Sequence, residues 1–127
     1  MITESAAERR RSQRLLCHAA LQFRDLQQPG GPYTGGLAKD VSAGGLKFET
    51  AQFFSHQRRL LMQVALPGVP TPIRTVAQVV WTYKQPHNDQ YEIGAQFVEI
   101  TPHDREAMAS YVERGVHVVA RPLSAAS

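Results

Sequence analysis

Apolar residues recur at every second position over much of this chain, and this alternation constrains its fold more than any other sequence feature. One alternate set in the stretch from 15 to 24 is uniformly apolar, namely Leu15, Cys17, Ala19, Leu21 and Phe23. Side chains at every second position of a β-strand lie on the same face. The pattern therefore predicts a strand with one buried face.

The same alternation recurs later in the chain. We expect three more strands, whose shared faces carry Leu60, Met62, Val64 and Leu66, then Ile73, Ala77, Val79, Trp81 and Tyr83, then Tyr91, Ile93, Ala95 and Phe97. Two shorter strands are expected at residues 37–41 and 46–49. The segments QQPGGPYTGG, PGVPTP and KQPHND are rich in turn-forming residues. About six short antiparallel strands joined by turns predict a β-sandwich or a β-barrel.

Signals for one helix follow the last expected strand. Thr101 is a favourable N-cap, Pro102 suits the first helical position, and Asp104 lies three residues after the cap. An apolar stripe follows, formed by Met108, Tyr111 and Val112. We expect Gly115 to end the helix. The following segment VHVVAR suits either a further strand or a docked tail, and the final PLSAAS is expected to be frayed.

Composition narrows the class of protein. The 127 residues suit one domain, and 43% hydrophobic with 20% charged residues is typical of a globular chain. The single cysteine excludes an internal disulfide and a zinc cluster built from cysteines, and the five histidines lack ligand spacing. No stretch is long and apolar enough to span a membrane, and no apolar run near the N-terminus suggests a signal peptide. We therefore expect a cytoplasmic protein.

The formal net charge is only +3, but basic residues are concentrated near the N-terminus. The segment ERRRSQR, residues 8–14, contains Arg9, Arg10, Arg11 and Arg14. Residues 1–9 show no apolar periodicity and are expected to form a mobile arm. Two interpretations are open: the arginines are a solvated tail, or they hold a planar anionic ligand.

A second informative segment is DVSAGGLKF, residues 40–48. It combines Asp40, Ser42, Gly44 and Gly45 at the start of an expected strand. Its ordinary interpretation is a hairpin turn with an exposed aspartate, because Asp, Ser and Gly are common turn residues. Glycines also allow a ligand to approach the backbone closely, which leaves a binding role open.

Together the two segments resemble the signature of the PilZ domain, a bacterial receptor module for cyclic di-GMP. The segments QYEIGAQFVEI and TPHDREAMASYV resemble the last barrel strand and the C-terminal helix of that family. The resemblance implies an all-β fold with one C-terminal helix, in which a six-stranded antiparallel β-barrel packs against the helix. Residues 10–115 are then the domain, between the arm at 1–9 and a tail at 116–127.

The resemblance also implies a ligand site for this second messenger. The positions that match the family motifs are Arg10, Arg14, Asp40, Ser42 and Gly45. Arg9 beside the first motif is expected to help, and Arg11 and Gly44 carry less weight. For Trp81 core packing is favoured, although related domains place an aromatic residue there against a guanine. No metal and no other cofactor are expected.

The chemistry of guanine suits these residue types. A guanidinium fork matches the O6 and N7 acceptors of the base and also pairs with phosphate. Asp40 can accept hydrogen bonds from the N1–H and N2 amine, and Ser42 can donate to a phosphate or bridge to the base edge. Gly44 and Gly45 leave room for the flat face of the ligand.

Several functions remain open at this point. A stand-alone receptor would change conformation on binding cyclic di-GMP and signal through an unidentified effector protein. A PilZ-like adaptor in pilus or flagellar function would act without the nucleotide, although the retained arginines argue against it. Nucleic-acid binding is disfavoured because no series of exposed aromatic residues is evident. An enzyme is not expected, because no nucleophile–base pair emerges.

Overall fold

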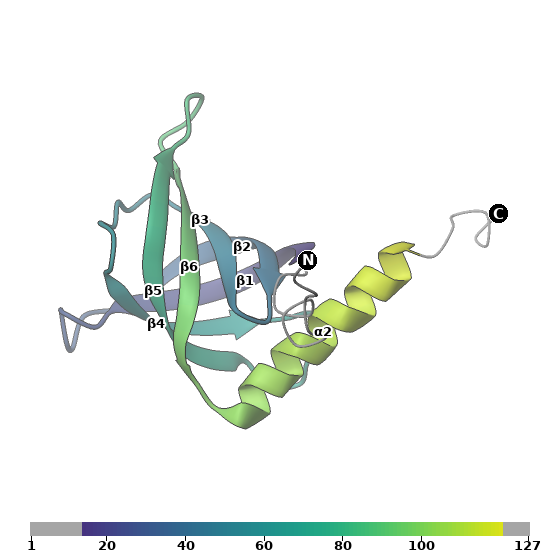
Figure 1. Cartoon of the computed structure of the whole chain (residues 1–127). Coiled ribbons are helices and arrows are strands. Elements are labelled where there is room, and N and C mark those ends of the chain that lie inside the picture. The colour runs from purple at the N-terminus through teal and green to yellow at the C-terminus, as the bar shows by residue number, and fades with distance from the viewer. Residues whose placement is uncertain (1–13, 121–127) are drawn as a thin grey trace, which may run out of the picture.

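The structure is a computed structural model that describes residues 14–120, with side chains placed for residues 14–115. Six β-strands are followed by one α-helix (Figure 1). The elements are β1 (Arg14–Asp25), β2 (Thr34–Ser42), β3 (Gly45–Thr50), β4 (Arg59–Ala65), β5 (Ile73–Lys84), β6 (Tyr91–Ile100) and α2 (Pro102–Ala120). The predicted arm at 1–9, Arg9, Arg10 and Arg11, and residues 121–127 of the predicted tail lie outside the described residues.

The strands form a closed antiparallel barrel in the order β1-β2-β3-β6-β5-β4. The barrel closes where β1 pairs with β4, for example Leu21 opposite Val64. Closure satisfies the backbone hydrogen bonds that an open sheet leaves free at its edges. The prediction of a six-stranded antiparallel barrel with a C-terminal helix is confirmed.

The alternating apolar residues fill the barrel. Leu21 and Phe23 of β1 are buried, and Phe23 packs against Phe48 of β3 with ring centroids 5.3 Å apart. Phe54, in the segment between β3 and β4, packs edge-on against the Phe23 ring, with the two ring centroids 5.5 Å apart. Aromatic side chains bury large apolar areas, so this cluster contributes much of the core energy.

Local irregularities in the ladder change which side chains face outward. The register shifts between Leu16 and Ala19 on β1, between Ala38 and Asp40 on β2, and between Val79 and Trp81 on β5. An extra residue in one strand reverses the alternation beyond it. The expectation that Trp81 and Tyr83 share a face with Ile73, Ala77 and Val79 is therefore wrong. Ile73, Ala77 and Val79 are buried, whereas Trp81 and Tyr83 are 37% and 55% exposed.

The helix begins as predicted. The amide of Asp104 donates to Thr101 Oγ1 at 3.1 Å, so Thr101 is the N-cap. Figure 1 shows α2 starting where β6 ends and running diagonally past one side of the barrel. Met108 and Val112 are buried against the barrel.

The predicted helix end at Gly115 is wrong, because α2 continues to Ala120. The left-handed glycines in the described part of the chain are Gly30 and Gly68, so Gly115 does not adopt the backbone conformation of a C-cap. A Cβ atom at Gly115 would lie 2.2 Å from Leu15 Cδ2. Close packing on β1, rather than helix termination, accounts for this glycine. The segment from 116 to 120 is thus helical and not a further strand.

Candidate functional site

An ion pair on the outer surface of the barrel joins the two sequence motifs. Arg14 is the first residue of β1, and its Nε donates to Asp40 Oδ1 on β2 at 2.7 Å. The Asp40 side chain is only 9% exposed, whereas the Arg14 side chain is 49% exposed. The expectation of an exposed aspartate in a turn is wrong, because Asp40 lies in a strand and its neighbours cover it.

Lys47 of β3 completes the surroundings of Asp40. Its Nζ lies 3.3 Å from Asp40 Oδ2 and 3.9 Å from Glu92 Oε1 on β6. Each oxygen of Asp40 therefore has a cationic partner, which offsets the desolvation of a nearly buried carboxylate. The register explains this arrangement, since Asp40 pairs directly with Lys47.

The Ser42 hydroxyl organises the turn between β2 and β3. It accepts hydrogen bonds from the amides of Gly44 at 3.3 Å and Gly45 at 3.1 Å, and it donates to the Gly45 carbonyl at 3.1 Å. Ser42 is 2% exposed. The hydroxyl thus serves the backbone of the turn, and a direct contact between Ser42 and a ligand stays a prediction.

The two glycines of this turn lie against β6. A Cβ atom at Gly45 would lie 2.3 Å from the Ala95 carbonyl oxygen, which no larger residue tolerates. The Gly44 carbonyl accepts the Phe97 amide at 2.9 Å. The close approach of β6 requires Gly45, whatever either glycine contributes to ligand binding.

Trp81 lies in the same transverse row of residues as Asp40. Successive register pairs across β1, β2, β3, β6 and β5 align Leu16, Asp40, Lys47, Gly94 and Trp81. The indole covers Gly94, where a Cβ atom would lie 2.1 Å from Trp81 Nε1. The favoured interpretation of Trp81 as a core residue is therefore wrong. The bulge at Val80 turns the indole onto the outer surface.

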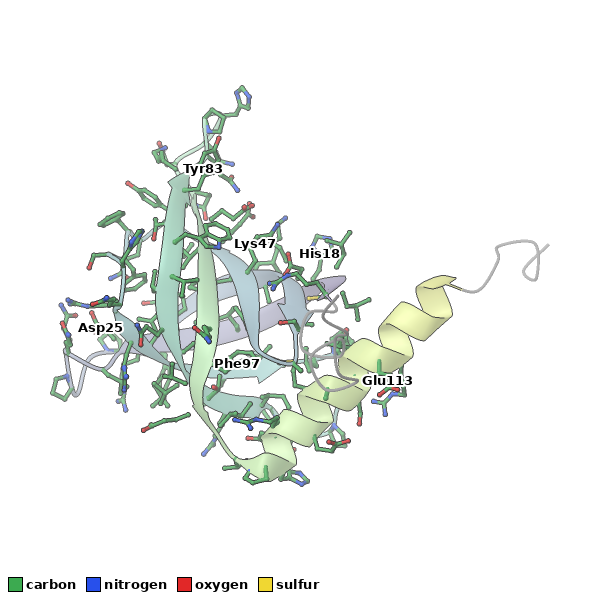
Figure 2. The ribbon with its side chains drawn as sticks, viewed as in Figure 1. His18, Asp25, Lys47, Tyr83, Phe97 and Glu113 are labelled. Carbon is green, nitrogen blue, oxygen red and sulfur yellow. The ribbon has the colours of Figure 1, made fainter. Side chains whose placement is uncertain are left out.

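A depression of about 350 Å³ borders this row. It is lined by Leu16, Cys17, His18, Lys39, Lys47 and Glu92. Figure 2 shows Lys47 and His18 near each other on one side of the barrel, with Asp25 on the opposite side. Leu16 is 82% exposed, which is unusual for a leucine in a paired strand. The depression therefore combines an apolar surface with charged groups of both signs.

Cys17, which lines the depression, and Tyr111 of α2 have raised pKa values. Burial is the main cause that raises the pKa of the Cys17 thiol, and the negative charge of Asp40 raises this pKa further. The pKa of Tyr111 on α2 is raised by burial first and by Cys17 second. Both groups are thus neutral at physiological pH, and Cys17 is not an activated nucleophile.

The structure brings Arg14, Asp40 and the turn at Ser42 close together and places Trp81, the lower-weight candidate, at the end of the same row; their contact with a ligand stays a prediction. Lys47 and Glu92 were missed by the sequence analysis. Alternation in GLKFE, with Leu46 and Phe48 inward, indicates that Lys47 points outward beside Asp40. Glu92 carries no comparable signal, because its position depends on the pairing of β3 with β6.

The comparisons with known proteins identify the family and agree with the fold. The family model described as PilZ domain matches residues 8–114, which include both motifs and all six strands. The chain belongs to the PilZ domain family. A comparison with curated protein sequences found no match to this chain.

Solved structures share the fold at low sequence identity. The inhibitor of motility MotI/DgrA of Bacillus subtilis is 21% identical, with a TM-score of 0.71 over 86% of this chain and 51% of that protein. The complex of K. pneumonia MrkH with c-di-GMP is 18% identical, with a TM-score of 0.68 over 85% of this chain and 52% of MrkH. The PilZ domain of Escherichia coli YcgR, solved with c-di-GMP, is 13% identical, with a TM-score of 0.61 over 84% of this chain and 90% of that domain.

This chain spans about half the length of MotI/DgrA and MrkH. The comparisons indicate no enzyme family. Within residues 14–120, the structure contains no helix that is both long and apolar enough to cross a membrane. Among the side chains of residues 14–115, no group of three or more His, Cys, Asp or Glu is arranged to hold a metal ion.

Proposed function

We propose that this chain is a receptor for cyclic di-GMP that binds the dinucleotide on the outer surface of the barrel. The Arg14–Asp40 ion pair carries the proposal, because it joins the two sequence motifs in one donor–acceptor unit. Two structural neighbours, MrkH and YcgR, were solved with c-di-GMP, which supports the choice of ligand.

One guanine fits this unit chemically. The Arg14 guanidinium donates to the O6 and N7 acceptors of the base or stacks on its plane. In this proposal Asp40 accepts from the N1–H and the N2 amine. Its Oδ2, which has Lys47 as its cationic partner, has a further lone pair for them, whereas Oδ1 is in contact with two nitrogens of Arg14. Trp81 offers an exposed indole on the same surface for stacking.

The remaining predicted residues have supporting roles in this proposal. Arg9 and Arg10, with a smaller part for Arg11, contribute charge for the phosphates. Ser42 and Gly45 hold the turn that ends β2 in place, and Gly44 shares that task. The ligand requires no metal and no further cofactor.

The receptor would signal by a change in conformation that an unidentified effector protein recognises. A soluble second messenger of bacteria requires a binding site in the cytoplasm, so we place the protein there. The alternative is a PilZ-like adaptor in pilus or flagellar function that does not bind the nucleotide. The intact arginine and aspartate motifs favour the receptor.

Calorimetric titration of the purified chain with cyclic di-GMP tests the proposal. GMP and cyclic di-AMP are the controls, because the first lacks the second nucleotide and the second lacks the O6 acceptor. The receptor is expected to bind cyclic di-GMP at least tenfold more tightly than either control. Absent or equal binding would favour the adaptor or a general affinity for anions, and the latter would weaken steeply with salt.

A further inference from the structure

We propose that Lys47 and Glu92, next to Arg14 and Asp40, form a second guanine-recognition contact in the depression beside the row of residues that contains Asp40. This inference rests on the proposed function. It assigns the selectivity for a second guanine to a lysine–glutamate pair that lies outside both sequence motifs.

The geometry leaves this pair available for a ligand. Lys47 Nζ and Glu92 Oε1 are 3.9 Å apart, at the outer limit of an ion pair, whereas Lys47 lies 3.3 Å from Asp40. The side chains of Lys47 and Glu92 are 28% and 27% exposed. Both therefore line the depression with donors and acceptors that a ligand can reach.

Strand irregularities create the depression itself. Cys17 and His18 lie within the register shift of β1, and Lys39 lies within that of β2. All three line the depression, whose volume of about 350 Å³ lies within the range typical of small-molecule sites. Bulges commonly re-aim side chains next to binding sites.

The chemistry of the lining suits a purine. The exposed Leu16 side chain offers an apolar surface to the face of a base, on the rim opposite β6. Lys39 also lines the depression, but its Nζ lies 3.4 Å from Glu49 Oε1, and the Gln85 amide donates to Glu49 Oε2. Among the charged side chains that line the depression, Lys47 and Glu92 thus offer a donor and an acceptor side by side, whereas the acidic partner of Lys39 is also bound by Gln85.

The order of these two groups selects guanine over adenine. Guanine presents the O6 acceptor beside the N1–H and N2 donors, which match the Lys47 ammonium beside the Glu92 carboxylate. Adenine presents an N6 donor beside the N1 acceptor, so each group would face a like group. Buried or half-buried polar groups left without partners disfavour the wrong base.

Binding of the mixed dinucleotide cyclic GMP-AMP separates the two base contacts. It can place its guanine at Arg14 and Asp40 but must then place its adenine at Lys47 and Glu92. The wild-type chain is expected to bind cyclic di-GMP about tenfold more tightly than cyclic GMP-AMP. Glu92→Gln can offer an amide donor to adenine N1, so this ratio is expected to fall below about threefold. Lys47→Met is expected to lower it likewise, because the donor to O6 is lost.

Glu99→Gln is the matched control, since Glu99 also lies on β6 but borders another depression near the start of α2. It is expected to keep the wild-type ratio, and thermal unfolding verifies that each variant folds. An unchanged ratio in Glu92→Gln, with equal weakening of both dinucleotides by Lys47→Met, would mean that Lys47 acts only on Asp40 and would overturn this inference alone. Failure of the wild-type chain to bind cyclic di-GMP would overturn the proposed function and this inference with it.

Discussion

Leu15 of β1 fills the space beside Gly115 of α2, where a Cβ atom would lie 2.2 Å from Leu15 Cδ2, 3.0 Å from Cδ1 and 3.2 Å from Cγ. Leu15 directly follows Arg14 in β1, so the residue next to the Arg14–Asp40 ion pair is in contact with the C-terminal helix. The proposed ligand contacts at Arg14 and the position of α2 are therefore linked through one peptide bond of β1.

Gly115→Ala is expected to destabilise the protein. The added methyl group must displace the buried Leu15 side chain, and overpacking typically costs about 1–3 kcal/mol, of which the better helix propensity of alanine offsets up to about 1 kcal/mol. We expect the free energy of unfolding in urea to fall by about 1–2 kcal/mol. Gly35→Ala is the control, because a Cβ atom there has no neighbour within 4 Å. A loss of stability no larger than that of the control would contradict the close packing of Leu15 on Gly115.

Asp40→Ala is expected to weaken cyclic di-GMP binding at least tenfold, because a charged acceptor for the guanine edge is removed. The fold should persist with a loss of about 1 kcal/mol, since Arg14 is half exposed and can be hydrated, and Lys47 keeps Glu92 nearby. Calorimetry and urea unfolding measure the two effects separately. Asp89→Ala, in the exposed turn between β5 and β6, is the control. Wild-type affinity in a folded Asp40→Ala variant would remove Asp40 from the site.

Ser42→Ala is expected to act mainly on stability. The substitution removes the hydroxyl that accepts from the amides of Gly44 and Gly45 and donates to the Gly45 carbonyl. These backbone groups then lose a hydrogen-bond partner in a buried turn. Unsatisfied buried polar groups cost about 1–3 kcal/mol, and urea unfolding should show a loss of that size. Ser110→Ala removes a hydroxyl that donates to Glu106 on the exposed face of α2 and should be nearly neutral. Equal stability of the two variants would show that the hydroxyl of Ser42 is not needed for the turn.

Trp81 provides an intrinsic probe, because it is the single tryptophan of the chain. A guanine bound on the row of residues that contains Asp40 should change its fluorescence, and cyclic di-AMP at the same concentration should not. If the indole stacks on a base, Trp81→Ala should weaken binding about tenfold by calorimetry, since base–aromatic stacking contributes about 1–3 kcal/mol. Tyr33→Ala, in the segment before β2, is the control, with Tyr33 39% exposed. Unaltered affinity in Trp81→Ala would mean that the indole only covers Gly94.

Local signals predicted most of the fold. The alternation in β1 and β4, the turn residues between strands and the cap at Thr101 act over a few residues, so their consequences follow from neighbouring positions alone. The resemblance of the two motifs then led to the Arg14–Asp40 pair, although the sequence did not show that the two residues form an ion pair.

The exposure of Asp40, the outward position of Trp81 and the helix end at Gly115 were mispredicted for a common reason. Each depends on a segment distant in the sequence: Arg14 and Lys47 cover Asp40, the bulge against β6 reverses the alternation before Trp81, and Leu15 packs on Gly115.

The approximate number of strands along the chain and the start of the helix thus follow from the amino-acid sequence, because periodicity and capping are local properties. The association of the two motifs came from their resemblance to a known family. The strand register of the folded barrel sets which face each side chain beyond a bulge occupies and which side chains come together. Lys47 and Glu92 show the difference, since they are 45 positions apart in the sequence but belong to two adjacent strands. Their proximity follows from the register between β3 and β6, which is set by the closure of the whole barrel.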